Sequence, residues 1–198
     1  MPERHPRRRA VRMAATAVAA VALALVLASP AWAAVHLDVP NFDQHAQPIP
    51  NGCALTSLAM VGAYYGSGKT LQQSSAAMLN HGVASDGEVY NWSSAAAALG
   101  GTVSYVRKNP AANDGLIRAE LDHGRPVIAW DNRAGPHSYV IVGYEGGDFF
   151  INDPAYGSKN VRCPYAREGF HLLTGTPVKP DVKPPLRIAM RGTAGELK

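Results

Sequence analysis

Cys53 is the residue of this chain best placed to act as a nucleophile. It precedes a run of helix-favouring residues, in which Leu55 and Leu58 stand at helical spacing and Gly66 provides a stop. In the first turn of a helix, unpaired backbone N–H groups and the positive end of the helix dipole favour a thiolate. A small apolar residue in a core is the other interpretation of a free cysteine, and this segment alone leaves both open.

His137 and Asp153 are the residues that could activate such a nucleophile, which needs a base, a group that holds the base, and donors for the oxyanion. His137 stands at the head of the apolar run 138–143, a predicted strand. Asp153 ends the strand predicted to pair with it. Antiparallel pairing would bring the two side by side, so that Asp153 accepts from the imidazole and fixes its tautomer. An Asx-Pro turn is an alternative role for Asp153.

The other histidines that follow residue 33 have no such pattern around them. They stand in predicted loops, helix ends or the region towards the tail, and we expect each to be a surface or capping residue: His36, His45, His81, His123 and His171.

Two further residues affect what Cys53 can do. Gln44 lies in a loop nine residues before it, close enough in the chain to fold back beside it, although taken alone the residue is better explained as an ordinary polar loop residue. Cys163 is the second of the two cysteines. In an exported protein a cysteine pair suggests a disulfide, which would make Cys53 structural.

Other catalytic chemistries find no support in the sequence. The chain contains no Cys-x-x-Cys and no His-x-x-x-His, so we expect no metal site. It has no glycine-rich phosphate loop, and Ser57 lacks the Gly-x-Ser-x-Gly elbow of a serine hydrolase. We expect no cofactor.

Residues 1–33 are typical of an export signal. Five arginines form a basic start, residues 14–28 are apolar and uncharged, and residues 29–33 end in a small-x-small cleavage pattern. The apolar run is short for a bilayer span, which needs about 20 residues. We expect a secreted or periplasmic protein with no stable membrane insertion after leader removal; a retained N-terminal anchor is the alternative. The export route, Sec or twin-arginine, stays open.

The leader also accounts for the basic character of the chain. The formal net charge is +4, and the leader's five arginines and one glutamate carry all of it. The pI of about 9.2 is therefore no sign of nucleic-acid or anionic-membrane binding.

The order of the predicted elements indicates the fold class. Helices are expected at 71–81 after Thr70, at 85–98, and at 116–123 after Asn113. Strands are expected at 35–40, 102–106, 126–130, 138–144 and 149–151. Helices first and adjacent strands afterwards favour an α+β fold with an antiparallel sheet. We expect one domain over residues 34–175 and a Pro/Lys-rich C-terminal tail over residues 176–198.

Four segments together carry a family resemblance. Residues 39–44, 52–61, 137–144 and 151–154 occur in an order similar to that of the papain-like cysteine peptidases of the bacteriocin-processing (double-glycine leader) type and their stand-alone secreted relatives. The resemblance covers about residues 37–173. The chain departs from it at Ala54 and Leu55, where many members have glycine and proline.

The resemblance implies a papain-like fold, with N-terminal helices packed on a C-terminal antiparallel sheet, and a role for each candidate. Cys53 matches the nucleophile and His137 the base that later protonates the leaving amine. Asp153 matches the residue that orients His137. Gln44 matches the side chain that donates to the oxyanion, beside the backbone N–H of Cys53. Neither a metal nor an organic cofactor is implied.

The sequence thus predicts an exported, monomeric cysteine peptidase that hydrolyses peptide bonds through a thioester on Cys53, with a peptide or protein as substrate. Two alternatives stay open. One is a thiol amidase or transpeptidase on the same fold. The other is a non-catalytic peptide- or cell-wall-binding domain with a Cys53–Cys163 disulfide.

Overall fold

The computed structural model describes residues 34–178, apart from residues 112 and 133–134. The predicted signal peptide, residues 1–33, lies outside the described residues, and so does the predicted tail beyond residue 178.

Helices come before most of the strands, as the sequence predicts. A short 3-10 helix η1 (Gln44–Ala46) precedes three α-helices: α2 (Cys53–Tyr64), α3 (Leu71–Met78) and α4 (Trp92–Leu99). A fourth helix, α5 (Asp114–Asp122), lies between the second and third strands. The strands are β1 (Val35–His36), β2 (Ser104–Asn109), β3 (Val127–Asp131), β4 (His137–Glu145), β5 (Asp148–Asp153), β6 (Ser158–Arg162) and β7 (Gly169–Thr174).

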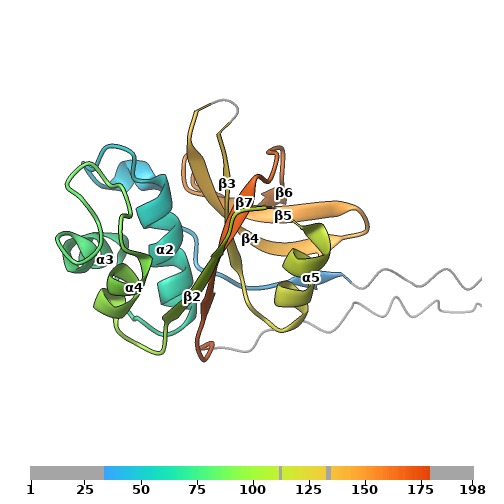
Figure 1. Cartoon of the computed structure of the whole chain (residues 1–198), viewed down its shortest axis with the longest axis horizontal. Helices are drawn as coiled ribbons and strands as arrows, with labels where there is room; N and C mark the ends of the chain where they lie inside the picture. The colour runs from blue at the N-terminus through green and yellow to red at the C-terminus, as the bar shows by residue number, and fades with distance from the viewer. Residues whose placement is uncertain (1–33, 112, 133–134, 179–198) are drawn as a thin grey trace, which may run out of the picture. The chain divides into compact units, whose positions relative to one another are not determined.

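The strands form one antiparallel sheet in the order β2-β7-β3-β4-β5-β6, with β1 paired to β4. The α2–α4 group lies on one side of the central strands and α5 on the other (Figure 1). Both α2 and α5 pack on β4, which explains why residues 139–144 are all buried. Each fully buried Leu, Ile or Val side chain at these contacts contributes about 1.5–3 kcal/mol. The predicted α+β fold is confirmed.

Two helix boundaries differ from the sequence-based expectation. Helix α3 ends at Met78 and not at residue 81, and α4 begins at Trp92 and not at residue 85. Gly82 has φ +107°, and a Cβ there would collide with the backbone of Asn91. The chain therefore turns tightly between the helices, and Asn91 becomes the N-cap of α4 by accepting from the Ser94 N–H at 3.0 Å.

The strands that differ most from expectation are β1, β6 and β7. β1 pairs over only two residues of the predicted 35–40 strand. β6 and β7 were not predicted, yet β7 lies in the middle of the sheet, between β2 and β3. His171, which we expected on the surface or at a cap, is a buried residue of β7, so that expectation is wrong.

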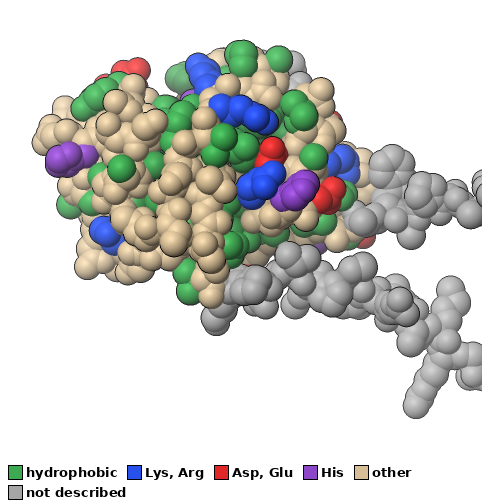
Figure 2. Space-filling view, turned by 60° about the horizontal axis from the view of Figure 1, so that its bottom comes forward, with side chains coloured by type: hydrophobic (Ala, Val, Ile, Leu, Met, Phe, Trp, Pro, Cys, Tyr) green, Lys and Arg blue, Asp and Glu red, His purple; other side chains and the backbone are tan. Residues whose placement is uncertain are grey.

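The charge distribution on the surface and the lengths of the helices can be described for residues 34–178. On the face shown in Figure 2, basic and acidic side chains lie next to one another and form no large patch of one sign. No helix in residues 34–178 is both long and apolar enough to cross a bilayer.

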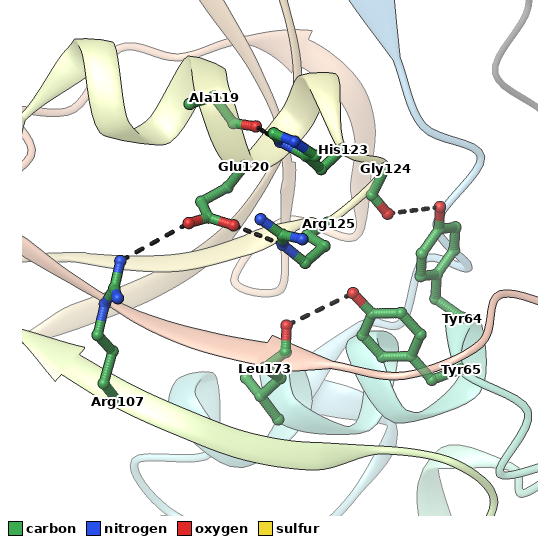
Figure 3. Close-up of polar contacts among 9 residues, drawn as sticks. All are labelled: Tyr64, Tyr65, Arg107, Ala119, Glu120, His123, Gly124, Arg125 and Leu173. Atoms are coloured by element: carbon green, nitrogen blue, oxygen red, sulfur yellow. Dashed lines mark hydrogen bonds and ion pairs between the residues drawn. The ribbon is translucent and has the colours of Figure 1, made fainter.

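A polar cluster ties α5 to the sheet and to α2 (Figure 3). Glu120 is 7% exposed, and its two carboxylate oxygens face Arg125 at 2.5 Å and Arg107 at 3.7 Å. The Tyr64 hydroxyl donates to the Gly124 carbonyl at 3.0 Å. Since both oxygens of the carboxylate face guanidinium groups, this cluster is structural.

Candidate active site

Cys53 is the first residue of α2, and its side chain is half-buried. The preceding Gly52 is the N-cap but offers no side-chain acceptor, so the first N–H groups of the helix have no side-chain cap. A Cβ on Gly52 would crowd the Gln47 amide at 3.1 Å and the Ile49 carbonyl at 3.2 Å. Glycine at this position lets the preceding loop lie tightly against the start of the helix.

The surroundings of Cys53 favour its thiolate. Burial alone would raise the pKa of the thiol, but three hydrogen bonds and one charge outweigh it and lower the pKa. The bonds come from the His137 side chain and from the backbones of Ser138 and Ala54; the charge is that of His137. The Ser57 hydroxyl also donates to the Ser138 carbonyl at 3.3 Å, which ties the start of α2 to β4.

His137 is held between the thiol and a carboxylate. Its Nε2–H donates to Asp153 Oδ1 at 3.0 Å, so Nδ1 is the ring nitrogen left for Cys53. Burial tends to lower the pKa of the imidazole, but the bonds to Asp153 and Cys53 raise the pKa to about 9. The lowered thiol pKa and the raised imidazole pKa together favour a thiolate beside an imidazolium.

Asp153 ends β5 and is 3% exposed. β4 and β5 pair antiparallel, and this pairing brings His137 and Asp153 together as the sequence predicts. Burial would raise the pKa of the Asp153 carboxyl, but hydrogen bonds from His137, Tyr165 and the Ala155 N–H lower it. The Ala155 N–H bond, at 2.9 Å, is the Asx turn considered above, so the turn and the contact with His137 coexist.

Tyr165 was not selected from the sequence, yet it touches both members of this pair. Its hydroxyl donates to Asp153 Oδ2 at 2.6 Å, and its ring meets the His137 ring edge-to-face with centroids 5.1 Å apart. No sequence motif marks Tyr165, because it lies in the irregular segment between β6 and β7.

Gln44 begins η1 and lies against the start of α2. Its Cβ is 3.9 Å from the position that a Cβ on Gly52 would take, one residue before Cys53. Its backbone N–H donates to the Pro154 carbonyl at 2.9 Å, so the same loop is tied to the turn after Asp153. Gln44 Oε1 is buried and has no hydrogen-bond partner among the described residues.

Cys53 and Cys163 are both free thiols with different neighbours. Cys163 Sγ lies 3.6 Å from the Tyr165 carbonyl oxygen, and burial raises the pKa of this thiol. Only Cys53 has a histidine among the groups that act on its pKa.

Two cavities meet at His137. The smaller, about 210 Å³, lies towards Asp131 and also borders Tyr156 and Tyr165. The larger, about 630 Å³, lies on the side of Trp130 and is lined by further aromatic side chains. Within residues 34–178, no group of three or more His, Cys, Asp or Glu is placed to hold a metal ion.

The helix-then-sheet fold, with a cysteine at a helix start against a histidine on the sheet, defines the class of papain-like cysteine peptidases. Within that class, the chain belongs to the Peptidase_C39 like family, whose model matches residues 36–172. The family resemblance drawn from the sequence is therefore confirmed.

Two solved structures are similar to the chain. One is a double glycine motif protease from an AMS/PCAT transporter in complex with the leader peptide; identity is 25%, the TM-score is 0.53, and 73% of this chain and 99% of that chain are covered. The other is described as a C39-like peptidase from Bacillus anthracis; identity is 19%, the TM-score is 0.49, and 72% and 98% are covered. No curated protein matches the chain in sequence.

Proposed function

We propose that the chain is an exported cysteine peptidase in which Cys53 is the nucleophile, His137 the acid and base, and Asp153 the residue that orients His137. The hydrogen-bonded series from Cys53 through His137 to Asp153 carries the proposal. A buried core cysteine needs neither a histidine at its sulfur nor a carboxylate behind that histidine.

In the first half of the reaction, the Cys53 thiolate attacks the carbonyl carbon of the peptide bond and an S–C bond forms. His137 gives its proton to the amide nitrogen, the C–N bond breaks, and the amine leaves. In the second half, neutral His137 takes a proton from water as the water oxygen attacks the thioester carbon. The S–C bond breaks, the acid product leaves, and the thiolate–imidazolium pair is restored.

We propose Gln44 and the Cys53 backbone N–H as the oxyanion donors. A flip of the Gln44 side-chain amide by half a turn exchanges the positions of its oxygen and nitrogen. Which of the two positions holds the nitrogen is decided by the hydrogen-bond partners around them. The buried position now held by Oε1, which has no partner among the described residues, can then carry an N–H donor. Removing one oxyanion donor costs roughly 10²–10³-fold in kcat.

Substrate class and location are also part of the proposal. The similar double glycine motif protease is solved with a leader peptide, which supports a peptide as the substrate here. The predicted signal over residues 1–33 supports export, and fractionation of cells producing the full chain, with N-terminal sequencing of the product, tests it. Retention of residues 1–33 in the membrane fraction would favour the anchor alternative.

The first test measures which thiol reacts with iodoacetamide at pH about 6, well below the usual thiol pKa of about 8.5. We expect rapid labelling of Cys53, slowed by His137→Ala, and little labelling of Cys163, whose pKa is raised by burial. Labelling only after reduction, with a Cys53–Cys163 peptide in the digest, would support the disulfide alternative.

The second test identifies the products. The wild-type chain and Cys163→Ser should cleave a peptide library, and Cys53→Ala should be inactive. Mass spectrometry with an added amine separates hydrolysis, which incorporates water, from transfer to the amine. Unchanged cleavage by Cys53→Ala would rule out the thioester mechanism.

A further inference from the structure

The larger cavity at His137 is a groove whose walls come from distant parts of the chain. His137 and Ser138 border it, so it opens directly onto the candidate catalytic pair. Its other lining side chains are mostly aromatic or polar and include Tyr90, Trp92, Tyr105, Lys108, Trp130 and His171.

The floor of this groove consists of aromatic side chains that pack against one another. Trp92 of α4 stacks on His171 of β7 with centroids 3.7 Å apart and planes within 12°. Trp130 of β3 lies 5.0 Å from the same imidazole, and the Tyr105 hydroxyl is 3.2 Å from its Nδ1. Since the rings are fixed by one helix and three strands, the groove exists before any ligand arrives.

Gly169 explains how Trp130 can lie in this wall. A Cβ on Gly169 would overlap the six-membered part of the Trp130 ring and would also approach the Asn109 carbonyl. The absence of a side chain at this position in β7 lets the indole lie across the strand.

The groove presents the faces of aromatic rings beside an equally extensive set of polar groups. Tyr90 is 61% exposed at its rim although its ring is large and apolar. Lys108 Nζ lies 5.1 Å from the Trp130 ring centre. Burial, and then the Lys108 charge, lower the pKa of His171 to about 4, so its ring is neutral at working pH.

We propose that this groove is the specificity subsite of the peptidase and takes an aromatic side chain of the peptide, next to or near the scissile bond. This inference rests on the proposed function for the nature of the ligand. Ring faces attract ring edges beyond the area that they bury, and the polar rim can meet the peptide backbone.

The test measures binding without turnover. In the full chain carrying Trp32→Phe and Cys53→Ala, Trp92 and Trp130 are the only tryptophans, and both line the groove. Their fluorescence is titrated with capped Gly/Ser hexapeptides that contain one Phe, Leu or Gly at the same position. We expect the Phe peptide to shift the emission and to bind about tenfold more tightly than the Gly peptide, and a few-fold more tightly than the Leu peptide.

Two exposed tyrosines provide a matched pair of variants. Tyr90 lies at the rim of the groove, and Tyr156, 75% exposed, borders the smaller cavity on the other side of His137. Tyr90→Ala should reduce the preference for Phe over Gly several-fold, whereas Tyr156→Ala should keep it. Because both side chains are exposed, neither truncation opens a core.

Three outcomes would overturn the proposal. The first is a Gly peptide that binds as tightly as the Phe peptide. The second is loss of the preference in Tyr156→Ala but not in Tyr90→Ala. The third is an emission shift with an N-acetylglucosamine oligomer and none with the Phe peptide, which would make the groove a glycan site. None of these needs a reactive Cys53, so failure of the subsite and failure of the peptidase mechanism are distinguishable.

Discussion

His137 and His171 are two histidines of the same sheet whose pKa values move in opposite directions. Burial pushes both pKa values down. At His137, Asp153 and Cys53 reverse the effect and raise the pKa to about 9. At His171, the neighbours are rings and Lys108, and the pKa falls to about 4.

The difference shows that burial lowers the pKa of a histidine in this sheet unless partners such as Asp153 and Cys53 outweigh it. A carboxylate and a thiolate give His137 a proton that can be transferred near neutral pH. Burial and a nearby ammonium keep His171 neutral, so it serves as one of the rings in the groove wall. Each of the following predictions changes a partner of His137 or His171, or the protonation of one of these two histidines.

Removing the carboxylate behind His137 should have the largest effect. Asp153→Ala should lower kcat/KM by roughly 10²-fold or more, because His137 loses both its orientation and the charge that holds its proton. Steady-state kinetics on the best library substrate measures the loss.

Asp153→Asn is the matched control. It keeps an acceptor for Nε2–H but loses the charge, so we expect a loss of about tenfold and an alkaline limit of activity at lower pH. Equal losses in both variants would mean that charge alone matters. Thermal unfolding of each variant shows whether the fold is retained.

Acid should unfold the protein partly through His171. Its folded pKa lies below the ordinary value of about 6.5, so the unfolded chain binds the proton first and stability falls as pH drops from about 6.5 towards 4. His171→Phe keeps a ring against Trp92 but cannot titrate. Between pH 7 and 5 the variant should lose on the order of 2 kcal/mol less than the wild type, as measured by denaturant unfolding. Parallel losses would contradict a neutral buried His171.

Alkali should act through His137. Above pH about 9 His137 loses the proton that it must give to the leaving amine, so kcat/KM should fall about tenfold per pH unit there. On the acid side kcat/KM should fall as the Cys53 thiolate is protonated. The same raised pKa stabilises the fold below about 6.5, and that stabilisation is lost as pH rises through 9. Activity that keeps rising to pH 10 would contradict the thiolate–imidazolium pair.

The smallest effect should come from Tyr165→Phe, which removes the hydroxyl bond to Asp153 and keeps the ring against His137. We expect kcat/KM to fall a few-fold, and the alkaline limit to rise slightly because Asp153 becomes the better acceptor for His137. Tyr144→Phe removes a similar bond, 2.7 Å to Asp122, at the far end of β4. A loss of the same size in Tyr144→Phe would indicate a general effect on the fold.

Much of the framework could be predicted from local sequence. The helix that starts at Cys53, the capping by Thr70 and Asn113, and the hairpin that pairs β4 with β5 all depend on residues close together in the chain. Antiparallel pairing across a short turn then brings His137 to Asp153. The roles of the four site residues are proposals, and the variants above test those of Cys53, His137 and Asp153.

Other features could not be predicted, because they depend on partners that are distant in the chain. Tight turns at Gly82 and Gly87 occupy the region where the sequence predicted the start of the helix over residues 85–98. The β7 segment shows no clear alternation of apolar and polar residues and pairs with strands far earlier in the chain. Neither the strand nor the burial of His171 could therefore be predicted from the sequence.

By itself, the sequence determined the order of helices and strands and the types of the reactive residues, because hydrophobic spacing, capping residues and short hairpins act locally. Only the tertiary structure decided that Tyr165 reaches Asp153 and that Trp92, Trp130 and His171 form one groove. The groove contacts join segments that come together because β7 lies between β2 and β3 in the sheet. Which distant side chains meet there depends on packing across strands, and no local pattern encodes it.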